Sequence, residues 1–244
     1  MKKLSLIFLF LAAFQLTASA QFGKKLGALA DKAGKVLNGE NPLSEDEIGN
    51  GLKEALDLGV KEAVTSLSAE DGYFASPYKI LIPEEAQVVT SKLKAIPGFG
   101  NVEAELEEKI NRAAELAATK ATPIFVDAIK GLTIKDAMSI LMGEQDAATR
   151  YLEGNTKSSL LDAFLPVIQS SLDEVNARDY WRTAVTAYNK IPFTKKTDPE
   201  LDRYVTEKAL VGMFSLVEKK EENLRDNPAM RQTELLRKVF SKQD

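Results

Sequence analysis

The chain contains no cysteine and no histidine among its 244 residues. Because it has no thiol, it cannot form a disulfide, a cysteine-ligated metal site or a cysteine nucleophile. Because it has no imidazole, Ser-His and Cys-His catalytic pairs and histidine-bound metals or haems are also excluded. Carboxylates, lysines, tyrosines and hydroxyls are therefore the groups that remain for chemistry.

The short motifs that bind common cofactors are absent as well. The sequence has no Walker-type phosphate loop, no glycine fingerprint for dinucleotides and no D-x-[DN]-x-[DN]-G calcium loop. The acidic run Glu45-Asp46-Glu47 is interpreted as the first turn of a helix, where carboxylates favour the helix dipole. We therefore expect no cofactor and no bound metal.

The first twenty residues have the pattern of a cleaved secretory signal. Lys2 and Lys3 precede an apolar run that ends at Leu16, and Ala18-Ser19-Ala20 supplies small residues for signal peptidase. The run is shorter than the roughly 20 residues that a spanning helix needs. We expect cleavage after Ala20, and the Met-Lys-Lys start is typical of bacteria.

The absence of cysteine and the net charge limit where in the cell the protein is expected and which classes of partner it is expected to bind. A bacterial lipoprotein is acylated on a cysteine at its cleavage site, so this chain is not one. Cleavage removes two of the 32 basic residues and none of the 36 acidic ones, which leaves a net charge of −6. This charge disfavours nucleic acid as a partner. We expect the periplasm, with secretion as the alternative.

Residues 21–43 are predicted to form a separate, lysine-rich leader or linker. Apolar residues at helical spacing share one face, and four lysines lie beside it: Lys24, Lys25, Lys32 and Lys35. Three glycines weaken this helix by up to about 1 kcal/mol each relative to alanine. One hypothesis is that the lysines contact an anionic membrane surface; a helix packed on the domain, or a flexible leader, is the alternative.

Residues 44–244 are predicted to form one all-α domain of about eight to ten helices. Apolar residues recur at helical spacing in several stripes, of which the first contains Leu52, Leu56, Val60, Ala63 and Leu67. Pro166 is expected to kink or split one helix. Only residues 78–82 resemble a strand, and one short run cannot form a sheet.

Cap residues support these helices. Ser44 with Glu47 and Thr133 with Asp136 are predicted capping boxes. Thr122-Pro123, Asp198-Pro199 and Asn227-Pro228 each place a cap residue before a proline suited to a first helical turn, and Gly131 and Gly143 mark helix ends.

Four strings occur in an order that resembles a known family. They are Ile110–Glu115, Asp146–Tyr151, Tyr204–Leu210 and Leu224–Pro228, supported by Asp71-Gly72 and Ile80–Pro83. Over about residues 48–240 the chain resembles the bacterial exported family catalogued as domain of unknown function 4197. The resemblance implies an exported helical protein and carries no catalytic residue, substrate or partner. Some members are lipoproteins, from which this chain departs by lacking cysteine.

Three groups of polar residues are candidate ligand-binding sites. Asp146, Thr149 and Arg150 lie close together in sequence, and Asp146 and Arg150 share a helical face. The structural alternative, which we favour, is that Asp146 caps a helix and pairs with Arg150, while Asn155-Thr156 caps a following helix.

The other two groups also have structural alternatives. Asn111 and Glu115 face away from the apolar stripe of their helix, so they either line a groove or form solvated or interhelical contacts. Arg225, Asn227 and Arg231 could bind an anion at a helix N-terminus. The alternative is a helix junction held by a cap and ion pairs.

No catalytic constellation stands out from these structural interpretations. We therefore favour a non-enzymatic envelope protein that binds a partner or a small apolar ligand among its helices. The alternative is a hydrolase or lyase that uses carboxylates or a lysine, for example Lys157 beside Ser158 and Ser159.

Overall fold

The computed structural model describes residues 43–83, 87, 101–174, 176–190, 192–193, 196, 198 and 200–241. The chain divides into two units, Met1–Ser44 and Glu45–Asp244, and the helices described below belong to the second. The predicted signal peptide and the lysine-rich segment with Lys24, Lys25, Lys32 and Lys35 lie outside the described residues.

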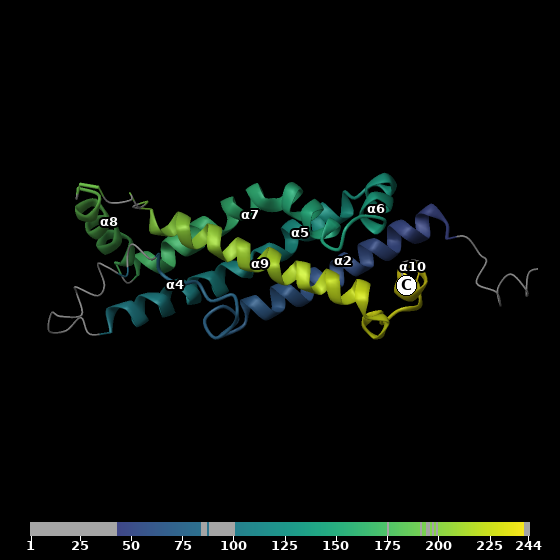
Figure 1. Cartoon of the computed structure of the whole chain (residues 1–244), viewed down its shortest axis with the longest axis horizontal. Helices are drawn as coiled ribbons and strands as arrows, with labels where there is room; N and C mark the ends of the chain where they lie inside the picture. The colour runs from purple at the N-terminus through teal and green to yellow at the C-terminus, as the bar shows by residue number, and fades with distance from the viewer. Residues whose placement is uncertain are drawn as a thin grey trace, which may run out of the picture. The chain divides into compact units, whose positions relative to one another are not determined.

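The described part of the second unit is all-helical, which confirms the predicted fold class. It contains no strand and consists of eight α-helices and one short 3-10 helix. Figure 1 labels the α-helices. In chain order they are α2 Glu45–Ser68, α4 Val102–Ala118, α5 Ala121–Lys130, α6 Ile134–Leu141, α7 Ala147–Asp173, α8 Ala177–Tyr188, α9 Leu201–Asp226, η1 Pro228–Met230 and α10 Glu234–Phe240.

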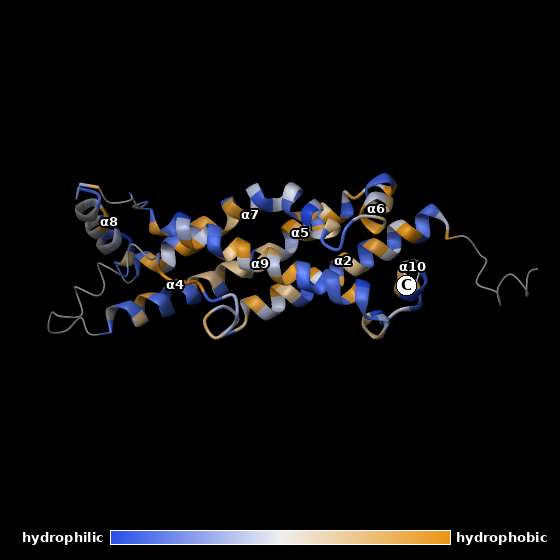
Figure 2. Cartoon of the chain, viewed as in Figure 1, coloured by the Kyte–Doolittle hydropathy of each residue, from blue (hydrophilic) through white to orange (hydrophobic). Residues whose placement is uncertain are grey.

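The long helix α9 is the central element of this unit. It packs against α2, α4 and α7 (Figure 1). Its buried side chains include Met213, Phe214 and Val217, and the ring of Phe214 meets Phe125 of α5 edge to face at 5.9 Å. Apolar residues recur along each long helix in Figure 2, as the periodicity predicts. None of the described helices is long and apolar enough to cross a membrane.

The predicted apolar stripe from Leu52 to Leu67 is buried. The helix boundary predicted at Asn155-Thr156 is wrong. α7 runs without interruption through Gly154 and Pro166. Asn155 and Thr156 therefore cap no new helix. Their side chains donate to the carbonyls of Tyr151 and Leu152, four residues earlier in α7. Serine, threonine and asparagine can bond within a helix in this way as well as at its start.

The caps were predicted with mixed success. The Thr133–Asp136 capping box at the start of α6 is confirmed, as is Asn227, whose side chain accepts from the amide of Ala229. α5 begins at Ala121, before the predicted Thr122 cap. α9 begins at Leu201 after Glu200, and Asp198 accepts a hydrogen bond from the Glu200 amide instead of capping α9 directly.

Candidate functional site

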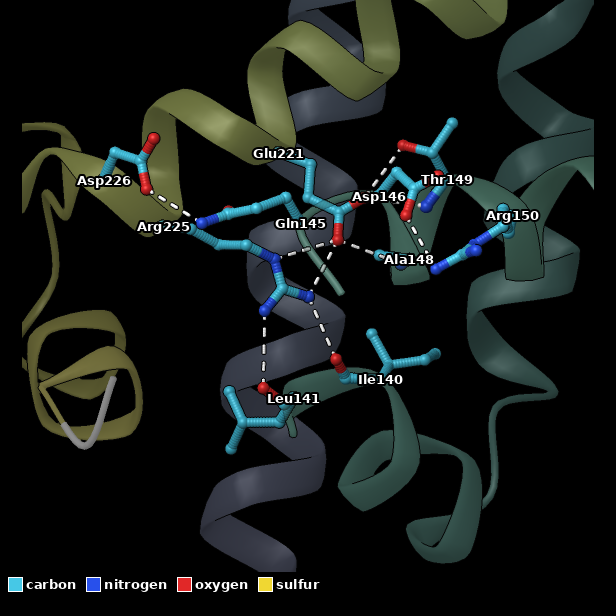
Figure 3. Close-up of polar contacts among 10 residues, drawn as sticks. All are labelled: Ile140, Leu141, Gln145, Asp146, Ala148, Thr149, Arg150, Glu221, Arg225 and Asp226. Carbon is cyan, nitrogen blue, oxygen red and sulfur yellow. Dashed lines mark hydrogen bonds and ion pairs between the residues drawn. The ribbon is translucent and has the colours of Figure 1, made fainter. Parts of the chain in front are cut away.

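A buried ion pair on α9 is the centre of the first polar cluster. The guanidinium of Arg225 donates from Nε and Nη2 to Glu221 Oε1, at 3.0 and 2.8 Å (Figure 3). Only 4% of the Arg225 side chain and 8% of the Glu221 side chain are exposed. Two charges this deeply buried need further hydrogen bonds to offset their lost hydration.

Arg225 obtains these bonds from the end of α6. Its Nη2 donates to the carbonyl of Ile140 at 3.0 Å, and its Nη1 donates to that of Leu141 at 3.3 Å. Ile140 and Leu141 are the last two residues of α6, and the carbonyl of Ile140 also accepts from the amide of Gly143 at 3.1 Å. Arg225 therefore caps the C-terminus of α6 with a positive charge, which the helix dipole favours.

Glu221 caps the N-terminus of α7 with a negative charge. Its Oε1 accepts from the amide of Ala148 at 2.9 Å, and its Oε2 accepts from the amide and the hydroxyl of Thr149, both at 2.8 Å. These amides belong to the first turn of α7 and are unpaired within it. Thus one ion pair on α9 caps two consecutive helices and fixes the turn between them.

Two exposed contacts lie at the rim of this cluster. Arg150 pairs with Asp146 at 2.7 Å, and Gln145 donates to Asp226 at 3.1 Å (Figure 3). Asp146 precedes α7 directly but makes no side-chain cap. The structure thus confirms the Asp146–Arg150 pair and assigns the cap to Glu221.

Arg231 and Asn227 lie at the junction that follows α9. Arg231 donates from Nε to the carbonyl of Leu224 at 3.1 Å and from Nη2 to that of Arg225 at 2.7 Å. It thereby caps the C-terminus of α9, while Asn227 begins η1. These contacts agree with the helix-junction interpretation. The assignment of Arg225, Asn227 and Arg231 to an anion stays a prediction.

The second polar cluster fixes the segment between α2 and residue 83. Asn111 of α4 is fully buried; its Oδ1 accepts from the amide of Ile80 and its Nδ2 donates to the carbonyl of Ile80, both at 2.8 Å. The side chain of Asn111 thus takes the place of a neighbouring strand, which explains why residues 78–82 look like a strand and join no sheet. Of the readings that the sequence left open, the solvated face does not apply to Asn111, because this segment covers it.

Glu115 lies one turn further along α4 and is also buried. Its Oε1 accepts from the amides of Tyr73 and Phe74 at 3.1 Å, and its Oε2 accepts from Arg112 at 2.9 Å. The Tyr73 hydroxyl donates to the carbonyl of Ala209 on α9 at 2.7 Å. Burial, and then the nearby charge of Glu115, raise the pKa of the Tyr73 phenol well above its ordinary value, so it remains a donor.

A third cluster, which sequence reasoning missed, joins α7, α8 and α9. Asp202 accepts from Gln169 at 2.6 Å and lies 3.5 Å from Arg178, which also bonds Asp173 at 2.8 Å. Glu221 was missed too, although its spacing of four residues from Arg225 is a signal for an ion pair. Tyr73 has no such signal, because its partners are distant in sequence.

The first two clusters bind backbone groups of the protein itself, which is a structural use of polar residues. Each carboxylate oxygen of Glu221 and Glu115 accepts hydrogen bonds from the protein. Lys157 pairs with Glu153 at 2.8 Å on the exposed side of α7. Among the described residues, no group of three or more carboxylates is placed to share a metal ion. No observation in the described residues favours the hydrolase or lyase alternative.

An exposed apolar surface on α6 is the remaining candidate site. Ile134, Met138 and Met142 follow one another at spacings of four residues, and their exposed fractions are 43%, 38% and 73%. Side chains at this spacing lie on the same side of a helix. We refer to these three residues as the α6 stripe. The adjoining face of α6 buries Ala137, Ile140 and Leu141 in the domain, and Met142 is the residue directly after the last turn of the helix.

The described residues form an all-helical fold in which buried charged side chains hold the ends of helices. The chain belongs to the family described as "Protein of unknown function (DUF4197)", whose sequence profile matches residues 42–241. This match confirms the resemblance of the four sequence strings. No curated protein and no solved structure matches the chain.

Proposed function

We propose that this protein is a non-enzymatic, exported protein that binds a partner protein through the α6 stripe. The observation that carries the proposal is the exposed row of Ile134 and Met138 on α6 and Met142 at its C-cap, beside the face of α6 that is buried in the domain. Exposed apolar residues are common singly, whereas a row of three is a feature of binding surfaces. Methionine suits such a surface because its flexible thioether adapts to the shape of a partner.

The backbone of α6 is held at both ends, which favours binding because little backbone freedom is lost on association. At the start of α6, Asp136 completes the capping box with Thr133. The hydroxyl and amide of Thr133 donate to the Asp136 carboxylate and lower its pKa below the ordinary value. At the end of α6, Arg225 holds the last two carbonyls.

The charge beside the stripe indicates the chemistry of the partner. Lys135 is exposed on α6 next to the stripe, whereas Asp136 is engaged in the capping box. A short helix of eight residues offers a narrow apolar row. The partner that fits this surface is an amphipathic helix with an apolar face and an acidic residue at its edge, which would meet Lys135.

A partner is favoured over a small apolar ligand inside the protein. The cavity between α2 and α9, lined by Leu56, Gly59, Glu221 and Arg225 among others, has a volume of about 30 Å³. That volume is comparable to the space of a single water molecule, and far below the several hundred Å³ of ligand pockets. A larger hollow of about 620 Å³ lies on α7, but it is open at the surface and is lined mainly by charged and polar side chains: Arg150, Glu153, Lys157 and Ser158.

The first test measures binding at the α6 stripe. Purified protein carrying a photo-crosslinking amino acid in place of Ser139, which is exposed beside the stripe, would be irradiated with extract of the native cell envelope. We expect a defined adduct that Met142→Glu weakens by about tenfold, since a charge in an apolar contact costs at least about 1.4 kcal/mol. Lys135→Glu should weaken it by up to about fivefold.

The matched control for this test is Val211→Glu. Val211 is 63% exposed on α9, outside the stripe, so the substitution places the same charge on an exposed apolar position. It should leave the adduct unchanged. Equal loss of the adduct in Met142→Glu and Val211→Glu, or no loss in either, would contradict the proposal. Unfolding temperatures of all variants confirm that they fold.

The second test concerns export. Lys2, Lys3 and the apolar run before Ala18-Ser19-Ala20 support cleavage after Ala20. We expect the protein isolated from its native cells to begin at Gln21 and to fractionate with the periplasm. A native protein that begins at residue 1 or 2 would show that the segment is not a cleaved signal.

A further inference from the structure

Two of the four methionines in the described part of the chain lie on the α6 stripe. The chain has five methionines and no cysteine. Met213 is fully buried, Met230 and Met138 are each 38% exposed, and Met142 is 73% exposed. The fifth is Met1, within the expected signal peptide. Two of the three exposed methionines therefore lie on the α6 stripe, four residues apart and on one side of the helix.

We propose that Met138 and Met142 form a reversible oxidation site that switches off partner binding at the α6 stripe. This inference rests on the proposed function, and the oxidant is a peroxide. Exposure governs the selectivity, because the sulfur of Met213 is shielded by the core. No thiol of the chain competes for the oxidant, since the chain contains no cysteine.

The chemistry is a two-electron oxygen transfer. The thioether sulfur attacks one peroxide oxygen, an S–O bond forms and the O–O bond breaks. The other oxygen leaves as water after it takes up a proton, so sulfur is oxidised and the peroxide is reduced. Enzymes of the methionine sulfoxide reductase class return two electrons and restore the thioether.

The consequence follows from the polarity of the product. A sulfoxide oxygen is a hydrogen-bond acceptor, and an apolar partner face offers it no donor, so the oxidised stripe binds more weakly. The buried face of α6 contains Ala137, Ile140 and Leu141 and no sulfur. Oxidation therefore changes the exposed side of α6 and leaves its packing against the domain intact.

The test oxidises the purified full chain with hydrogen peroxide, removes the peroxide and then repeats the crosslinking with envelope extract. Peptide mass spectrometry should find sulfoxide first at Met142, next at Met138 and Met230, and last at Met213. The adduct should weaken by about tenfold and return after treatment with a sulfoxide reductase. Oxidation at Met213 before Met142, or an adduct that persists on fully oxidised protein, would overturn the inference.

Two variants show which methionines cause the loss of the adduct on oxidation. The double variant Met138→Leu/Met142→Leu keeps an apolar stripe without sulfur, so its adduct should resist peroxide. Met230→Leu should lose its adduct on oxidation as the unsubstituted chain does. If peroxide leaves the adduct unchanged while Met142→Glu abolishes it, the oxidation switch fails and the docking function stands. If Met142→Glu leaves the adduct unchanged, the docking function fails and the switch fails with it.

Discussion

Replacing Arg225 with alanine is expected to lower the free energy of unfolding by about 3–5 kcal/mol, the usual cost of removing one partner of a buried ion pair. The loss is large because the substitution removes the hydrogen bonds that Arg225 donates to three groups: the Glu221 carboxylate and the carbonyls of Ile140 and Leu141. Urea unfolding followed by circular dichroism measures the change. It should appear as a lower midpoint with an unchanged slope.

The pair Asp146–Arg150 provides a matched control. It has the same spacing of four residues and a shorter contact of 2.7 Å, yet 58% of the Arg150 side chain is exposed. Arg150→Ala should therefore cost no more than about 0.5 kcal/mol. Similar losses in Arg225→Ala and Arg150→Ala would show that the buried pair does not hold the ends of α6 and α7.

A double-mutant cycle separates the ion pair from the caps. Glu221→Gln removes the charge and keeps one of the two oxygens that accept from α7, and the cycle with Arg225→Met gives the interaction energy of the two side chains. We expect a coupling of about 1–3 kcal/mol, because the two residues are in direct contact. If the two single losses of unfolding free energy add up to that of the double variant, the whole loss comes from the helix caps and none from the ion pair.

Replacing Asn111 with leucine is expected to cost about 2–5 kcal/mol. The new side chain is similar in size, but the amide and the carbonyl of Ile80 both lose their partner in a buried environment. Each buried backbone group left unpaired costs about 1–3 kcal/mol. Unfolding in urea measures the stability, and amide hydrogen exchange at Ile80 should accelerate together with it.

Asn155→Leu is the control for this substitution. Asn155 is exposed on α7, and its side chain donates to a carbonyl of its own helix. Removing that bond leaves no buried group unpaired, and leucine has the higher helix propensity, so stability should stay within about 0.5 kcal/mol. If Asn111→Leu is tolerated as well as Asn155→Leu, the Ile80 segment is not fixed by Asn111.

The helices could be predicted because their signals are local. The stripe Leu52, Leu56, Val60, Ala63 and Leu67 repeats at the helical period, and Thr133 and Asp136 are three residues apart. The length of α7 could not be predicted in this way, because Gly154 and Pro166 favour a break when each is considered alone. Packing of α7 against α4, α5 and α9 overrides that preference.

The polar sites were harder to interpret because their partners are remote backbone groups. Asn111 bonds a residue 31 positions away, and Glu221 bonds residues 72 and 73 positions away. A side chain that pairs with an amide or a carbonyl leaves no pattern in the sequence, since every residue except proline carries both groups. Sequence patterns can therefore indicate which polar side chains form buried contacts, but not the backbone groups that they bind. The α6 stripe was missed because a row of exposed apolar residues looks like a core face until its burial is known.

The double cap by α9 has a consequence for the order in which the domain assembles. Arg225, which holds the end of α6, lies 84 positions after Leu141 and 85 positions after Ile140 in the chain. A chain that is exported in the direction of its synthesis would deliver α6 well before Arg225 arrives, and a helix of eight residues is marginal by itself in water. On the proposed export, the α6 stripe would be fixed only when nearly the whole chain has crossed, so incomplete chains would present no ordered surface to the proposed partner.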